Sequence, residues 1–235
     1  QGFSAAEAGI EKAIQSDSAI SSFDLGNNST LQGVERNTVP AANQALEYPA
    51  LAKEELAQVW LAHPQTLSQF YDQVNIDIYW GLQNIINPDD KPAIEVTVIY
   101  LSGVIYQQRK FFFDSNSGRT GTNGFTDASS SCSNSLAAIT TSLGTNRTFF
   151  CKTTLTGLVP TLILLRARIL YSSVSQPFAV QPLGGSCGTN ACSLPVQARL
   201  FTATGSSGVT QRKVQVFRLD KVVPLYFDYA IFSAG

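Results

Sequence analysis

Apolar and polar residues alternate along several stretches of this chain, and the alternation predicts β-strands. In residues 73–80 one set of alternate positions is apolar and the other mostly polar, as in a half-buried strand: Val74, Ile76, Ile78 and Trp80 against Asn75, Asp77 and Tyr79. Residues 94–100 repeat this alternation. Together with residues 104–113 they predict an antiparallel hairpin that turns at residues 101–103.

More strands are expected downstream. The predicted strands cover residues 147–155, 161–171, 196–204 and 210–219, and a further edge strand is expected at residues 224–233. The segment Gly205-Ser206-Ser207-Gly208 separates two of them and signals a hairpin. Residues 49–62 mix helical and strand preferences, with a strand expected at their end. Residues 16–42, 114–135 and 176–195 show no sustained period and are interpreted as irregular connections.

The first fourteen residues have a different pattern, which predicts a helix. They read QGFSAAEAGIEKAI, and the apolar residues Phe3, Ile10 and Ile14 recur at offsets of seven and four, as on one stripe of an amphipathic helix. Helix-forming residues run from the first position without a capping Ser, Thr, Asp or Asn. We therefore expect the helix to extend upstream of residue 1.

This segment resembles the N-terminal helix of type IV pilins and pseudopilins, in the form found in minor pilin-like proteins. The matching residues are Phe3, Ala5, Ala6, Glu7, Ala8, Gly9, Ile10, Glu11 and Ala13. The resemblance implies a leader cleaved by a prepilin peptidase and an apolar anchor of about twenty residues. Residues 1–235 contain no such apolar run, so we expect residue 1 to lie just past that anchor.

One helix followed by many short strands predicts an α+β fold, in which the N-terminal amphipathic helix packs on an antiparallel β-sheet head. The pilin resemblance implies the same architecture. We expect two parts, the helix in residues 1–22 and a β-rich globular head in residues 23–235.

The charge composition narrows the possible partners. Charged residues make up 14% of the chain, the net charge is −1 and the pI is about 5.8. Nucleic-acid binding depends on clustered Lys and Arg, but the basic pairs Arg109-Lys110 and Arg212-Lys213 are far apart in the sequence. We therefore expect no nucleic-acid partner.

The four cysteines predict disulfides and an oxidising compartment. Cys132, Cys151, Cys187 and Cys192 lie in polar, turn-rich surroundings. The simplest pairing is Cys132 with Cys151 and Cys187 with Cys192, although four cysteines allow three connectivities. The wide separation of Cys132 and Cys151 does not fit the ligand spacing of zinc sites, and free thiols are the remaining alternative.

The matches to known catalytic motifs lack the neighbouring residues and order that those motifs require, so we expect no enzyme and no cofactor. A G-x-S-x-G match surrounds Ser186, but it lies in a Pro- and Gly-rich stretch, and the single histidine, His63, precedes it. A partial calcium-loop pattern at Asp114, Asn116 and Gly118 has Arg119 where such loops need Gly, so no metal site is assigned, although Asp127 is close in sequence.

Taken together, these observations predict a non-enzymatic subunit of an extracellular type IV pilus-like filament, in a minor or tip position. Its expected partners are other pilin-like subunits and, through the anchor, the inner-membrane assembly machinery. The proposed filament assembly helix carries Phe3, Glu7, Ile10, Glu11 and Ile14, with the two glutamates four residues apart on one face. We expect the head on the extracellular or periplasmic side, anchored to the membrane, or on the filament.

The alternative is a secreted glycan-binding or adhesin module. Its contact surface would combine Asn-rich loops with exposed aromatic residues, and the candidates are Trp60, Trp80, Phe111, Phe112 and Phe113.

Overall fold

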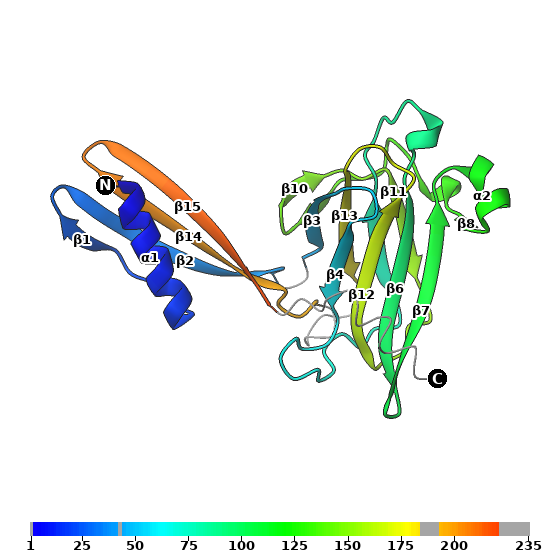
Figure 1. Ribbon diagram of the computed structural model, residues 1–235, viewed down its shortest axis with the longest axis horizontal. Helices are drawn as coiled ribbons and strands as arrows, with labels where there is room; N and C mark the ends of the chain where they lie inside the picture. The colour runs from blue at the N-terminus through cyan, green and yellow to red at the C-terminus, as the bar shows by residue number, and fades with distance from the viewer. Residues whose placement is uncertain (1, 42–43, 184–192, 221–235) are drawn as a thin grey trace. The chain divides into compact units, whose positions relative to one another are not determined.

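A computed structural model describes residues 2–41, 44–183 and 193–220 (Figure 1). Of these residues 51% are in strands and 13% are helical, and the strands form four sheets. The fold is therefore mostly β, and the predicted pilin-like α+β fold is wrong. The prediction failed because the apolar surface of one helix covers only one sheet, whereas most strands of this chain bury their faces against other strands.

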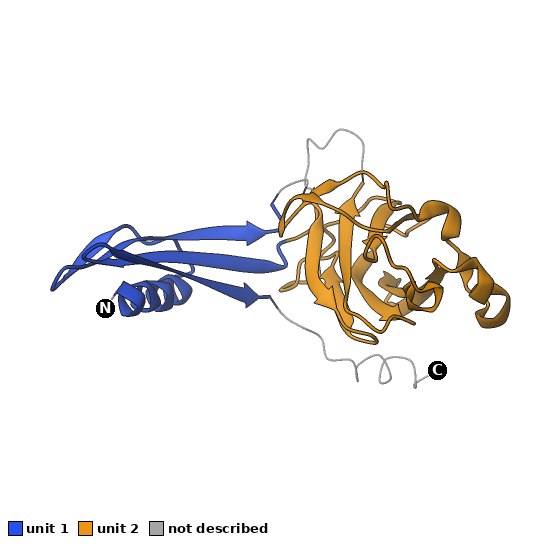
Figure 2. Ribbon diagram, turned by 90° about the horizontal axis from the view of Figure 1, so that it is seen from above, with its two compact units in different colours: residues 1–41, 196–220 blue, residues 42–195, 221–235 orange. Residues whose placement is uncertain are grey.

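The chain forms two compact units, shown in different colours in Figure 2. Unit 1 combines residues 2–41 with residues 196–220, and the described part of unit 2 consists of residues 44–183 and 193–195. Unit 2 is thus inserted between two strands of unit 1. The units divide the chain at positions other than residue 22, where the sequence analysis placed its boundary.

Unit 1 is a helix on a four-stranded antiparallel sheet. Helix α1 spans Gly2–Ser16, and the strand order is β1-β2-β14-β15. The bounds are Phe23–Gly26 for β1, Ser29–Val39 for β2, Ala198–Ser207 for β14 and Thr210–Leu219 for β15. The predicted hairpin of the last two strands is confirmed. The strands β1 and β2 replace the irregular connection expected in residues 16–42.

Small and branched residues form the core of unit 1. The buried residues that α1 and the sheet share are Ala6, Ile10, Ala13, Leu31, Val34, Phe201 and Ala203. On the opposite face the alternate positions of β14, Thr202 and Thr204, are polar. One face of this sheet is therefore apolar and covered by α1, and the other carries hydroxyl groups.

The described residues of unit 2 form three sheets. The first has the order β11-β5-β13-β3, with bounds Cys151–Leu155, Ile76–Trp80, Gln176–Pro182 and Leu46–Leu51. The second has the order β4-β12-β6-β7-β8, with bounds Leu56–Trp60, Leu162–Leu170, Ala93–Ser102, Ile105–Asp114 and Thr126–Asp127. The third pairs β9 (Ile139–Thr141) with β10 (Gly144–Arg147).

Short helical segments complete unit 2. Helix α2 spans Ser117–Asn123, and the 3-10 turns η1 and η2 span Pro88–Asp90 and Ser129–Ser131. The predicted hairpin of residues 94–113 is confirmed as β6 and β7, with its turn at Gly103 and Val104. By contrast, β13 lies in a stretch that was expected to be irregular.

Strand β5 shows why alternation alone misjudged burial in unit 2. Ile76, Ile78 and Trp80 are fully buried as predicted, but Asp77 and Tyr79 on the other face are buried as well, so β5 is not half-buried. Polar atoms on this second face are satisfied by neighbours: Asp77 pairs with Lys152 at 2.7 Å and accepts a 2.5 Å hydrogen bond from Thr154.

Candidate functional site

Helix α1 presents two unlike faces. Its buried side consists of Gly2, Ala5, Ala6, Gly9, Ile10 and Ala13. Of the residues predicted for filament assembly, Ile10 belongs to this buried side and Ile14 lies at its margin. Phe3 has 52% of its surface exposed, and Glu7 and Glu11 are exposed as well. The apolar stripe predicted through Phe3 is thus a row of small residues facing the sheet, with Phe3 outside it.

The residues on the buried side of α1 are mostly Gly and Ala, because the helix backbone approaches β14 very closely. A Cβ atom placed on Gly205 would lie 1.9 Å from the carbonyl oxygen of Gly2 and 2.9 Å from the amide nitrogen of Ala6. Another placed on Gly9 would lie 2.7 Å from both methyl carbons of Leu31. Backbone contact at Gly205 fixes the depth of α1 on the sheet, and the outer face of the helix is held in a defined position.

An ionic cluster holds the C-terminal end of α1. Asp17 accepts hydrogen bonds from Arg36, at 3.1 Å and 3.3 Å, and pairs with Arg199 at 3.2 Å. Arg218 donates to the carbonyl oxygen of Ile14 at 3.2 Å. At this C-terminal end of the helix a positive charge also interacts favourably with the helix dipole. The hydrogen bond from Arg36 lowers the pKa of Asp17, with smaller contributions from the charges of the other two arginines.

A disulfide joins Cys132 and Cys151, which confirms one predicted pair. Cys187 and Cys192 lie outside the described residues. The disulfide indicates an oxidising compartment, either extracellular or periplasmic. Within the residues that the structure describes, no helix has the length and apolar character needed to cross a bilayer.

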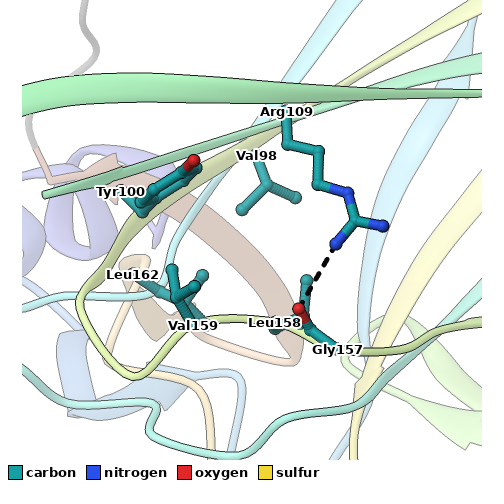
Figure 3. A pocket seen from close by; sticks show the side chains of 7 residues that line it. All are labelled: Val98, Tyr100, Arg109, Gly157, Leu158, Val159 and Leu162. Atoms are coloured by element: carbon teal, nitrogen blue, oxygen red, sulfur yellow. Dashed lines mark hydrogen bonds between the residues drawn. The ribbon is translucent and has the colours of Figure 1, made fainter. Parts of the chain in front are cut away.

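A small hollow lies between the β6–β7 hairpin and the loop at residues 157–162 (Figure 3). Its volume is about 70 Å³, and its walls are Val98, Tyr100, Arg109, Gly157, Leu158, Val159 and Leu162. Arg109 spans it by donating to the carbonyl oxygen of Gly157 at 3.3 Å, and its guanidinium stacks on Phe111. Pockets for small molecules measure roughly 300–1,000 Å³, so this hollow is too small to enclose one.

A larger groove lies on unit 1. It has a volume of about 380 Å³ and a mostly polar wall, formed by Ile20, Ser21, Ser22, Gln32, Gly33, Val34, Glu35, Thr202, Thr204 and Lys213. Hydroxyl, amide, carboxylate and ammonium groups converge there without an aromatic ring among them. This groove has the size and chemistry to accept a small polar molecule.

The calcium pattern forms a different structure, a buried ion pair. Asp114 is fully buried, and its carboxylate receives Arg119 at 2.7 Å and 3.1 Å. The side chain of Asn123 and the backbone amide of Asn116 each donate to it at 2.8 Å. The carboxylate oxygens are therefore occupied by protein donors. Across the described residues, no group of three or more His, Cys, Asp or Glu side chains is placed to hold a metal.

The remaining candidates are dispersed. His63 is exposed and stands edge-on to Phe70, with 4.7 Å between ring centroids. The G-x-S-x-G motif around Ser186 lies outside the described residues. Trp60 and Trp80, two of the aromatic residues suggested for glycan stacking, are buried, while Phe111, Phe112 and Phe113 are partly buried. The two tryptophans therefore offer no ring face to a ligand.

Comparisons with known proteins found no match: no family model, curated protein or solved structure is detectably similar to this chain.

Proposed function

We propose that this chain is a non-enzymatic subunit of an extracellular pilus-like filament and that α1 is its assembly element. The observation that carries the proposal is the position of Phe3. Its ring is half exposed on a helix whose other side is fixed to the sheet through glycine and alanine contacts. An exposed aromatic residue on a rigid helix is the kind of anchor that protein interfaces use.

The exposed acids fit the same role. Glu7 and Glu11 lie one turn apart beside Phe3, so a neighbouring subunit meets an apolar anchor flanked by two carboxylates. The similarity of residues 3–13 to the N-terminal helix of pilin-like proteins supports this assignment. It concerns the helix alone, since the mostly β fold does not support a pilin-like head.

Shearing of filaments from cells tests the proposal. The native gene, with whatever precedes Gln1, is expressed in its own host as wild type, Phe3→Asp and Leu25→Asp. Leu25 is the matched control, because it is a 46% exposed apolar residue of β1 in the same unit. We expect wild type and Leu25→Asp in the sheared filament fraction, and Phe3→Asp in the cell fraction. Equal recovery of all three, or no sheared wild-type protein, would contradict the proposal.

Glycan recognition is the second candidate, favoured by the polar groove of unit 1. Hydroxyl and amide groups of Gln32, Ser22 and Thr204 match the hydrogen-bonding groups of a saccharide. A glycan array with the wild-type chain and a Gln32→Ala variant tests this idea. Binding that falls with the variant supports it, and an array without any signal eliminates it.

A further inference from the structure

The β6–β7 hairpin of unit 2 ends in an apolar tip, which the proposed filament role does not use. The strands pair without a break from Ala93–Asp114 to Ser102–Ile105. The turn consists of Gly103, with φ +63°, and Val104. Figure 1 shows the hairpin continuing beyond the neighbouring strand ends of its sheet.

The exposure of this tip is unusual for its residue types. Val104 is 93% exposed, Ile105 63% and Tyr106 37%. Two-residue hairpin turns favour Gly, Asn, Asp and Ser, which water solvates well. A valine followed by an isoleucine at such a turn leaves two adjacent apolar side chains in water.

The β14–β15 hairpin has the same Gly-Val turn, but polar residues follow it. β14 and β15 are joined by Gly208, with φ +57°, and by the fully exposed Val209. The residues on either side of this turn are Ser207 and Thr210, and Gln211 follows. The same Gly-Val turn is thus followed by a polar residue, Thr210, in unit 1 and by an apolar residue, Ile105, in unit 2.

We propose that the β6–β7 hairpin inserts its tip into the surface of a lipid bilayer. From the tip toward the sheet, the residues of β7 change from apolar to aromatic, then to polar and charged, in the order met from the hydrocarbon core of a bilayer to its headgroups. Val104 and Ile105 form the apolar end, Tyr106 lies in the next row opposite Leu101, and Tyr100 lies one row further from the tip opposite Gln107, at the depth where amphipathic rings favour the interface. Gln107 and Gln108 come next, and Arg109 lies four residues above Ile105, or about 13 Å along a strand.

This spacing matches the dimensions of the interface. Segments that bind bilayer surfaces bury their apolar side roughly 5–10 Å deep. With Ile105 at that depth, Arg109 reaches the level of the headgroups. Its contact with Gly157 is to a neutral carbonyl, so the guanidinium keeps its charge for an anionic headgroup. Lys110 is held within the sheet, because it pairs at 3.0 Å with Glu95, whose carboxylate also binds Arg168.

Vesicle flotation of the purified chain tests the proposal independently of filament assembly. The vesicles contain phosphatidylcholine, alone or mixed with phosphatidylglycerol. Wild-type protein is expected to float with both kinds, and roughly fivefold more strongly with the anionic mixture because one cation reaches the headgroups. Replacing Val104 and Ile105 together by Asp is expected to weaken binding at least about tenfold, since their apolar transfer is lost.

Val209→Asp is the control, with a single Val-to-Asp substitution at the corresponding position of the same kind of turn. It is expected to float like wild type. Absence of flotation by the wild type would overturn the proposal and would favour a protein receptor as the partner of the tip. Equal binding by the tip variant, or equal loss in Val209→Asp, would also overturn it. Tryptophan fluorescence of Trp60 and Trp80, both in unit 2, verifies that the tip variant is folded.

Discussion

The carbonyl oxygen of Gly2 occupies the space that a side chain on Gly205 would fill, with only 1.9 Å between that oxygen and the Cβ position. This relationship joins the first turn of α1 to the C-terminal end of β14, although the two residues are far apart in the sequence. Neither backbone segment can withdraw without opening the core formed by Ala6, Leu31 and Phe201. The close approach therefore determines where the outer face of α1 stands.

Gly205→Ala is expected to destabilise unit 1 by about 3 kcal/mol or more, because the added methyl group collides with backbone atoms that cannot rotate away. Hydrogen-exchange mass spectrometry of peptides from α1 and β14 measures the effect locally. Fluorescence of the two tryptophans, which lie in unit 2, should hardly change. Gly121→Ala is the control, since nothing lies within 4 Å of its Cβ position. Unchanged protection of α1 in Gly205→Ala would show that the backbone contact is not tight.

Asp17 makes the attachment of α1 sensitive to acid. Its pKa is lowered in the folded chain from the ordinary value of 3.8, mainly by the hydrogen bond from Arg36. A carboxylate with a depressed folded pKa stabilises the fold above its unfolded pKa, and this stability is lost as the pH falls through the folded pKa. Protection of α1 amides should therefore decline below about pH 4.

The variant Asp17→Asn should show weaker protection at neutral pH and a flatter decline in acid. Asp24→Asn serves as the control, because Asp24 accepts a hydrogen bond from the backbone amide of Gly26 and has no arginine partner among the ion pairs of the described residues. Its acid profile should match that of wild type. Identical profiles for Asp17→Asn and wild type would assign the acid response to other carboxylates.

Local signals in the sequence were sufficient for two of the hairpins and for α1. The β6–β7 and β14–β15 hairpins have alternating strands close to a glycine turn, and each pairs within one short segment. The Cys132–Cys151 pair was likewise the simplest pairing along the chain, although the sequence left three connectivities open. These features depend on residues near one another in the chain, which is why pattern and turn chemistry identified them.

Strand β2 could not be predicted in this way. Its alternation changes phase between Leu31 and Val34, both of which face the core, because of an irregularity at Gly33, where φ is +125°. Its partner β14 follows about 160 residues later, after the whole of unit 2. The sequence therefore showed no regular period in β2, its nearby partner β1 is only four residues long, and the insertion of unit 2 went unrecognised. The apolar hairpin tip was visible as Val104-Ile105, but exposure cannot be seen in a sequence.

The Cys132–Cys151 disulfide should stabilise unit 2 by about 3 kcal/mol, the loop-closure value for a separation of 19 residues. Replacing both cysteines by alanine should lower the urea midpoint by the corresponding amount. Cys151 pairs directly with Trp80 across β11 and β5, so tryptophan fluorescence reports on this region. The protection of α1 in unit 1 should be unaffected. An unchanged midpoint would mean that the bond has no part in the stability of unit 2.

The ion pair of Asp114 and Arg119 should be costly to break, because the carboxylate is fully buried. Arg119 also donates to the backbone carbonyl oxygens of Asp89 and Lys91, and its guanidinium stacks on Tyr171 at 4.6 Å. It thereby joins η1, the start of α2 and the end of β12 around one buried carboxylate. Asp114→Ala leaves this cation without its counter-charge, which costs about 3–5 kcal/mol in buried pairs.

Urea unfolding followed by tryptophan fluorescence measures this loss, because Trp80 and Ser115, the residue after Asp114, donate to the same carbonyl oxygen of Pro92. Asp127→Ala is the control: its carboxylate is exposed and accepts from the amide of Ser129, so its removal should change stability by less than about 1 kcal/mol. Calcium should not shift the wild-type midpoint, since Arg119, Asn116 and Asn123 already occupy the Asp114 oxygens. A calcium-dependent rise would instead mean that a metal displaces the guanidinium.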